Sequence, residues 1–168
     1  METRFQGRAW LFGDDISTDH IIAGKYLGSM DLKSLAEHAM ENVDPQFSKK
    51  VRPGDILVAG SNFGCGSSRE QAPVALKGVG LSCVIAETFA RIFYRNAINI
   101  GFPLVECPAL RGKVKEGDSI SVDMAAGTIT LASAERIPFA PLPPNLLDIL
   151  RAGGLVPKLR QELAARPP

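Results

Sequence analysis

The residues with the most chemistry in this sequence lie in the stretch AGSNFGCGSSREQAPVAL, residues 59–76. Glycines at positions 60, 64 and 66 let the backbone come close to a ligand just before a predicted helix, whose first amide groups point at whatever lies ahead of it. Such a helix start binds anions. Arg69 lies in the predicted first turn, where a cation opposes the helix dipole, so its presence indicates an external negative charge. We call residues 60–70 the serine loop.

A simpler interpretation of the serine loop is a helix cap. Ser67, Ser68, Arg69 and Glu70 fit the capping box S-x-x-E, in which the serine oxygen and the glutamate satisfy free amide groups. Pro73 complicates this interpretation, because the residue before a proline avoids the helical region of backbone space. The sequence alone therefore leaves open a plain cap, an anion site, or a first turn separate from the helix proper.

Two other kinds of site fit the serine loop poorly. A P-loop needs lysine before serine or threonine after G-x4-G, whereas Gly66 precedes Ser67 here, which argues against a nucleoside triphosphate site. A nucleophilic Cys65 would need a histidine base, and His20 and His38 are both distant in sequence. We therefore leave Cys65 out of the predicted chemistry.

The composition predicts one soluble α/β domain spanning residues 1–168. The chain has a formal charge of +1 and 45% hydrophobic residues, with no basic field for nucleic acid and no apolar run of the roughly 20 residues that span a bilayer. No signal-peptide pattern is present, so we expect a cytoplasmic protein. The three cysteines are odd in number, widely spaced and without C-x2-C spacing, which predicts neither a disulfide framework nor a metal site on this chain.

Strand and helix patterns alternate around the serine loop, and a strand-rich section follows. Short apolar runs predict strands, and apolar residues at helical spacing or helix stop signals predict helices. Period-2 segments on either side of Ala125, Ala126 and Gly127 predict a hairpin within residues 117–133. The C-terminal region predicts two short helices broken at Gly153 and Gly154. The expected strands cover residues 8–12, 55–59, 81–87 and 102–106, and the expected earlier helices cover residues 29–43, 67–77 and 88–99.

Three segments together resemble a known family. GSNFGCGSSREQAPVALKGVG (60–80), VIAETFARIFYRNAINIGFPLVEC (84–107) and FGDDISTDHIIAGKYL (12–27) are similar to the swivel domain of the aconitase superfamily, in the form of the separate small subunit of isopropylmalate isomerase and homoaconitase. The resemblance covers nearly all of residues 8–108. It implies a three-layer β/β/α swivelling domain, in which helices flank a mixed sheet.

The resemblance also implies an activity and a partner. Members of this family are hydro-lyases that remove water from a hydroxy acid and add it back at the neighbouring carbon. Their large subunit carries a [4Fe-4S] cluster that acts as a Lewis acid on the substrate hydroxyl. We therefore expect a heterodimer or heterotetramer in which this chain is inactive alone and binds no metal itself. The expected substrate is a small di- or tricarboxylate, with 3-isopropylmalate of leucine biosynthesis favoured.

Matching residue by residue assigns roles to four side chains. By resemblance, Ser67 is the base that takes a proton from carbon, Ser68 donates a hydrogen bond to substrate, Arg69 binds a carboxylate, and Asp19 lies in the active site. A serine hydroxyl is a very weak acid, so this role for Ser67 requires positive potential from Arg69 and the helix amides. We expect His20 to be structural. Residues Arg91 and Arg95, four apart on one helix face, are expected to serve packing and surface, with a supporting role near the large subunit as the alternative.

Substrate choice in this family is associated with the loop at residues 24–31, here GKYLGSMD. Many relatives have arginine after Tyr-Leu, where this chain has Gly28, and Lys25 is the only cation in the loop. Tyr26, Leu27 and Met30 make the loop apolar enough to pack against an alkyl group, which favours an alkyl-malate over homocitrate-like acids. Homoaconitase, citramalate and 2,3-dimethylmalate dehydratases remain alternatives, and a non-catalytic anion-binding module is the alternative of another class.

Overall fold

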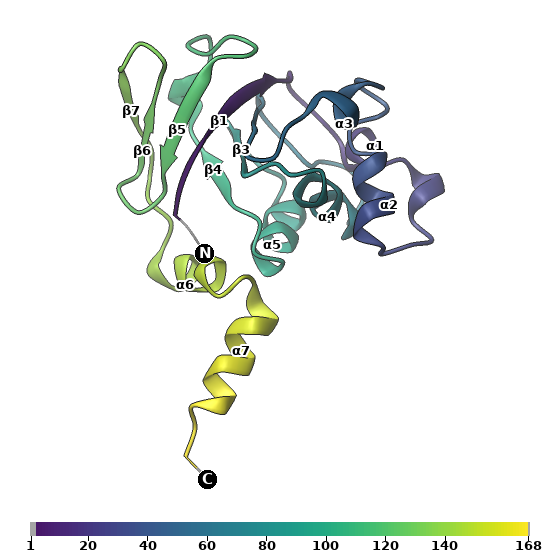
Figure 1. Ribbon diagram of the computed structural model, residues 1–168, viewed down its shortest axis with the longest axis vertical. Helices are drawn as coiled ribbons and strands as arrows, with labels where there is room; N and C mark the ends of the chain where they lie inside the picture. Colours follow the sequence, from purple (N-terminus) through teal and green to yellow (C-terminus); the bar gives the residue numbers. More distant parts are fainter. Residues whose placement is uncertain (1–2, 168) are drawn as a thin grey trace.

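The computed structural model describes residues 3–167, which form one seven-stranded sheet with flanking helices (Figure 1). The spatial strand order is β4-β3-β2-β1-β5-β6-β7. The first four strands in this order are parallel, and the remaining three continue from β1 in antiparallel pairing. The strands are β1 (Arg4–Leu11), β2 (Ile56–Val58), β3 (Cys83–Ala86), β4 (Leu104–Glu106), β5 (Ser119–Asp123), β6 (Thr128–Thr130) and β7 (Arg136–Pro138).

The helices are short, and most of them precede the antiparallel strands. No helix of residues 3–167 is long and apolar enough to cross a membrane. The helices are α1 (Thr18–Ile21), α2 (Leu32–Glu37), α3 (Phe47–Lys50), α4 (Gln71–Gly78), α5 (Arg91–Asn99), α6 (Pro144–Arg151) and α7 (Leu155–Ala164), and the 3₁₀ turns are η1 (Gly24–Tyr26) and η2 (Pro108–Leu110).

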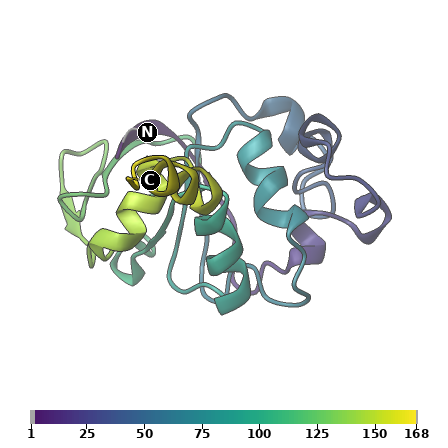
Figure 2. The same cartoon turned by 90° about the horizontal axis from the view of Figure 1, so that it is seen from below.

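The parallel half of the sheet is covered on both faces. Successive strand residues point to opposite faces, so Leu57 of β2 packs against α1 to α5 while Ile56 and Val58 pack on the other side. That other side is filled by the antiparallel strands and α6, for example by Ile120 and Ile129. The view from below separates the green antiparallel strands from the blue helices (Figure 2). The predicted β/β/α layering of a mixed sheet with flanking helices is therefore confirmed.

The predicted strands all exist. The four apolar runs are β1 to β4, although β1 begins earlier than expected, and the predicted hairpin is β5 and β6 with the antiparallel pairing that its pattern indicated. The two C-terminal helices also form, on either side of Gly153 and Gly154. Only β7 was not predicted, because a three-residue strand with one buried side chain, Ile137, is too short to show a period.

The helix expected over residues 29–43 is wrong in extent. α2 ends at Glu37, and Met40 has a φ of +59°, which no helix continues through. The Met40 amide donates to the carbonyl of Ile21 at 2.8 Å, so a tertiary contact replaces the last helical turns. Apolar spacing misled here because Met40 is buried from a turn rather than from a helix.

The helix expected to begin at Ser67 begins instead at Gln71, so the capping box is wrong. Glu70 is the cap residue, and it makes no side-chain cap hydrogen bond. Pro73 gives the physical reason: proline fits only the first turn of a helix, where its missing amide is not needed. Residues 67–70 consequently lie outside the helix, as Pro73 had indicated, and the Ser67 hydroxyl has no capping task.

Candidate active site

The site forms where two loops cross at one edge of the parallel sheet. Residues 13–17 follow β1 and the serine loop follows β2, and the carboxyl ends of neighbouring parallel strands lie at the same edge. A parallel bridge joins Ser17 to Cys65, and the Thr18 amide donates to the Cys65 carbonyl at 2.8 Å. The Gly64 amide donates to the carbonyl of Ile16 at 2.7 Å. Two of the three segments that carry the family resemblance, residues 12–27 and 60–80, thus lie side by side.

Glycine is required by the crossing at two positions of the serine loop. Gly64 has a φ of +83°, and a Cβ there would collide with the ring of Phe93. Gly66 has a φ of +97°, with the place of a Cβ only 3.4 Å from the Thr18 hydroxyl oxygen. Both positions favour glycine because side chains rarely adopt this backbone region. The glycines therefore let the loop backbone lie against Phe93 and Thr18 of the same chain.

Ser67 lies exposed at the tip of this crossing. Its carbonyl accepts hydrogen bonds from the Arg69 amide at 2.9 Å and from the hydroxyl of Thr18 at 3.0 Å, and its own hydroxyl oxygen lies 3.3 Å from that of Thr18. The amides of Gly66, Ser67 and Ser68 make no hydrogen bond within residues 3–167. A row of free amides beside an exposed hydroxyl is suited to an anionic ligand.

Arg69 and Asp19, both predicted site residues, meet in an ion pair. Nη1 of Arg69 donates to Oδ1 of Asp19 at 2.8 Å and to the carbonyl of Ile22 at 2.9 Å. The Arg69 hydrogen bond holds the pKa of Asp19 below its ordinary value. Arg69 is the more buried partner, with 20% of its side chain exposed against 61% for Asp19. The pair fixes one nitrogen of the guanidinium, while Nε and Nη2 make no hydrogen bond within the described chain.

The loop predicted to select substrate is attached to the turn after α2. The Tyr26 hydroxyl donates to Glu41 at 2.8 Å, and its ring stacks on His38 with the centroids 3.7 Å apart. Lys25 lies 3.8 Å from the same Glu41 carboxylate and over the Tyr26 ring. Hydrogen bonding with Tyr26 and the charge of Glu41 raise the pKa of Lys25. The loop cation thus stays charged and already has one carboxylate partner within the chain.

The rest of this loop approaches the serine loop through its backbone. The Leu27 carbonyl accepts from the side chain of Gln71, at the start of α4, at 3.2 Å. Gly28 is exposed, with nothing within 4 Å of the place of a Cβ. The structure thus brings Leu27 close to the Ser67 side of the molecule, while Lys25 and Tyr26 turn toward Glu41.

An open groove runs from Ser67 along α5. Arg91, Ile92 and Arg95 line it opposite Gly66 and Ser67, and the Ile92 side chain is 54% exposed. The sequence predicted packing and surface roles for the two arginines, with a supporting role near the large subunit as the alternative, and nothing local in the sequence connects them with the serine loop. Thr18 was missed altogether, although it precedes Asp19 directly, because only the tertiary crossing reveals what its hydroxyl contacts.

The cysteines and histidines do not form a metal centre. Within residues 3–167 no group of three or more cysteine, histidine or acidic side chains could hold a metal ion, so these residues do not fit an iron-sulfur cluster. Burial raises the pKa of Cys83 to about 12, which keeps its thiol protonated. Nδ1 of His20 accepts from the Ser17 amide at 2.9 Å, in a capping box of α1, which agrees with its expected structural role.

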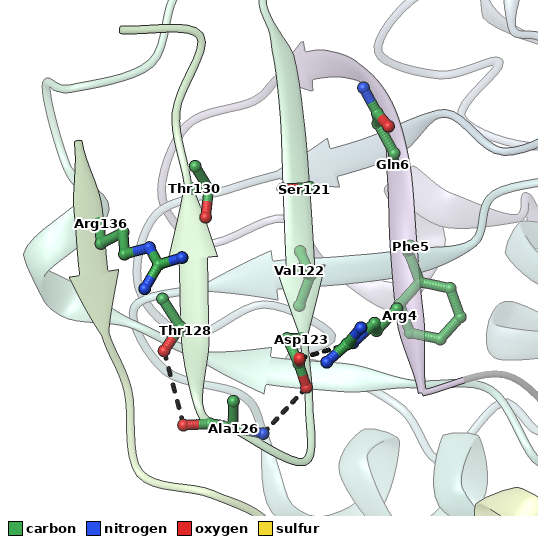
Figure 3. A pocket seen from close by; sticks show the side chains of 10 residues that line it. All are labelled: Arg4, Phe5, Gln6, Ser121, Val122, Asp123, Ala126, Thr128, Thr130 and Arg136. Carbon is green, nitrogen blue, oxygen red and sulfur yellow. Dashed lines mark hydrogen bonds and ion pairs between the residues drawn. The ribbon is translucent and has the colours of Figure 1, made fainter. Parts of the chain in front are cut away.

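A second polar hollow lies on the antiparallel half of the sheet (Figure 3). Arg4, Ser121 and Arg136 are among the side chains that line it, and Arg4 pairs with Asp123 at 2.7 Å. Its residues come from regular strands and from the turn between β5 and β6. None of the predicted site residues lies in it.

Comparisons with known proteins agree on one family. The model of the aconitase C-terminal domain matches residues 15–109. The 3-isopropylmalate dehydratase small subunit 1 of Methanopyrus kandleri is 52% identical over 96% of both chains. The isopropylmalate/citramalate isomerase small subunit of Methanocaldococcus jannaschii is 51% identical over 98% of both chains. A crystal structure of 3-isopropylmalate dehydratase from Methanocaldococcus jannaschii superposes with a TM-score of 0.90 and 44% identity over 96% of both chains.

Proposed function

Because this chain belongs to the aconitase C-terminal domain family, we propose that it is the small subunit of a 3-isopropylmalate dehydratase, a hydro-lyase of leucine biosynthesis in the cytoplasm. The observation that carries the proposal is the crossing of the two loops, which places Ser67, Arg69 and Asp19 together at one edge of the sheet. Relatives about half identical over almost the whole chain carry the same name. The proposed reaction interconverts 2-isopropylmalate and 3-isopropylmalate through an alkene.

The proposed roles of this chain are those of a base and a carboxylate clamp. Ser67 takes the proton from the substrate carbon, and its exposed hydroxyl is open to a ligand. Nε and Nη2 of Arg69, which have no partner within residues 3–167, bind a substrate carboxylate. Asp19 holds the guanidinium in place through its Nη1. Ser68 and the free amides beside it donate the remaining hydrogen bonds to the same anion.

The proposed partner is a large subunit, in a heterodimer or heterotetramer. A [4Fe-4S] cluster on that subunit would supply the Lewis acid that helps the substrate hydroxyl leave. The cysteines of this chain do not fit such a cluster. The substrate is then enclosed between the serine loop and the surface of the partner.

The proposed substrate has an alkyl group in place of a third carboxylate. Lys25, the only cation of the loop at residues 24–31, already has Glu41 as a partner at 3.8 Å, so another carboxylate there would compete with Glu41. Burying a carboxylate without a partner is costly, whereas Leu27 offers apolar surface. Citramalate is the second candidate, since the relative from Methanocaldococcus jannaschii is named for both isopropylmalate and citramalate.

Reconstitution with the cluster-bearing large subunit tests the proposal. The pair should turn over 3-isopropylmalate, and this chain alone should have no activity. Citramalate, 2,3-dimethylmalate and homoisocitrate are compared in the same assay, and faster turnover of homoisocitrate contradicts the alkyl-malate assignment. Calorimetry on the isolated chain addresses the non-catalytic alternative: tight binding of a small dicarboxylate without any partner favours an anion-binding module.

A further inference from the structure

Thr18 lies buried directly beneath Ser67. Its exposure is 2%, and Thr18 and Asp55 are the buried polar or charged residues of the described chain. Its backbone is fixed on both sides, since its amide donates to Cys65 and its carbonyl accepts from the Ile22 amide at 3.0 Å. The Thr18 hydroxyl can reach both the carbonyl oxygen of Ser67, at 3.0 Å, and the hydroxyl oxygen of Ser67, at 3.3 Å. Thr18 therefore has two alternative acceptors on one residue.

We propose that Thr18 is a positioning residue whose hydroxyl donates to deprotonated Ser67 and so makes Ser67 able to act as a base. This inference rests on the proposed function, because it concerns the ionised form that the dehydration requires. A hydrogen bond from a hydroxyl to an alkoxide is charge-assisted and about twice as strong as a neutral one. Thr18 is buried, so little water competes for its hydroxyl as the donor of this hydrogen bond.

The Thr18 hydroxyl can change acceptors without leaving a buried group unpaired. When it turns from the Ser67 carbonyl to the Ser67 hydroxyl oxygen, the carbonyl keeps its hydrogen bond from the Arg69 amide at 2.9 Å. The turn is a rotation about a single bond and needs no backbone movement. The change of acceptor therefore costs little free energy, because it leaves no acceptor without a hydrogen bond.

Arg69 does not replace Thr18 in this task. Its Nη1 is occupied by Asp19 and Ile22, and no hydrogen bond within residues 3–167 joins its side chain to the Ser67 hydroxyl. Arg69 supplies positive potential at a distance, whereas Thr18 is the hydrogen-bond partner of the Ser67 hydroxyl in the described structure. Because the positive potential of Arg69 and the hydrogen bond of Thr18 are different contributions, mutating each residue alone can distinguish them.

The proton movement balances in both directions. During dehydration the substrate C–H proton moves to Oγ of Ser67, the C–H electron pair becomes the second bond of the alkene, and hydroxide leaves with the C–O pair. Protonated Ser67 then donates to Oγ1 of Thr18, which returns to the Ser67 carbonyl. Hydration reverses each step, so Thr18 exchanges one acceptor for the other in each half-reaction.

The test compares Thr18→Val with Thr18→Ser in the reconstituted pair, with kcat measured across pH. Valine keeps the shape but removes the donor, so we expect kcat near neutral pH to fall about tenfold to a hundredfold. Because the deprotonated serine is the active form, the acidic limb of the kcat profile should shift toward higher pH, by about one pH unit for each tenfold decrease in kcat near neutral pH. Thr18→Ser keeps the hydroxyl and should restore most of the rate. Thermal unfolding of both variants checks that the chain remains folded.

A merely structural role for Thr18 gives a different result. If its hydroxyl only anchors the loop through the Ser67 carbonyl, Thr18→Val lowers the rate equally at every pH, and that outcome overturns the inference. In a Ser67→Ala background, Thr18→Val should cause no further loss, and an additive loss also overturns it. A wild-type pair that turns over no malate derivative removes the proposed function and the inference together, whereas an active pair with an unmoved pH profile removes the inference alone. If Thr18→Val fails to fold, Thr18→Ala is measured in its place with the same criteria.

Discussion

Two polar surfaces of this chain carry arginine, and they differ in how their polar groups are held. On the antiparallel half, Arg4 pairs with Asp123, and Asp123 also accepts from the Ala126 amide at 2.9 Å (Figure 3). These residues lie on neighbouring strands or in the turn that joins them, where the regular ladder pairs the backbone. At the serine loop, Arg69 reaches across the chain to Asp19, and the amides around Ser67 remain unpaired within residues 3–167.

The difference shows which features indicate a site. In the hollow between strands the ladder pairs the backbone, so the donors that have no partner within residues 3–167, such as the Arg136 guanidinium, belong to exposed side chains. The serine loop instead presents free donors that its own fold does not use, on a backbone held in place by Gly64 and Gly66. Unpaired donors on a fixed backbone are what a preorganised anion site requires. Paired mutations on the two surfaces test this distinction.

Replacing the two serines should give the largest contrast. Ser67→Ala removes the proposed base, and we expect kcat of the reconstituted pair to fall by about 10² to 10⁴. Ser121→Ala, in the other hollow, should leave turnover unchanged because its side chain lines a surface without a role in the reaction. Steady-state kinetics with 3-isopropylmalate measures both. Full activity of Ser67→Ala excludes Ser67 as the base.

Adding one methyl group should distinguish the required glycines from an unconstrained one. Gly64→Ala places a Cβ against Phe93 in a backbone conformation that alanine disfavours, so we expect a loss of about 2–4 kcal/mol in the free energy of unfolding. Gly13→Ala is the matched control in the crossing loop, because nothing lies within 4 Å of its added Cβ. Its free energy of unfolding should change by less than about 0.5 kcal/mol. Urea unfolding of the isolated chain measures both, and equal losses contradict the steric explanation.

The sequence predicted the strands better than the contacts between elements. Period and composition located β1 to β6, whereas the roles that the resemblance assigns to Ser67, Arg69 and Asp19 stay predictions. Propensity failed where tertiary contacts replace local ones, as at Met40, whose amide is paired with Ile21. The sequence also contains no signal for Thr18. Its hydroxyl lies between two acceptors only because segments far apart in sequence cross in the fold.

The two arginine surfaces should respond differently to lysine. Arg69→Lys keeps the charge but loses the fork that binds a carboxylate and Asp19 together, so we expect KM for 3-isopropylmalate to rise about tenfold with a smaller change in kcat. Arg136→Lys on the other surface should leave both constants unchanged. A KM that does not change in Arg69→Lys argues against carboxylate binding by Arg69.

The smallest expected effect concerns the carboxylates of the two surfaces. Asp19 and Asp123 both have a lowered pKa, chiefly through the Arg69 side chain for Asp19 and through the Ala126 amide for Asp123. Arg69→Gln should therefore raise the pKa of Asp19 toward its ordinary value and leave that of Asp123 in place, as carboxyl NMR titration of the isolated chain can measure.

The sign of the linkage follows from the lowered pKa of Asp19. A carboxyl group whose pKa falls on folding stabilises the folded chain at pH above its ordinary pKa, and this contribution disappears as pH falls through the lowered value. In Arg69→Gln the folding stability should depend less on pH in this acidic range, because Asp19 then has almost the same pKa in the folded and the unfolded chain. If Asp19 still titrates at its lowered pKa in this variant, Arg69 is not what holds it, and the orienting role proposed for the pair is wrong.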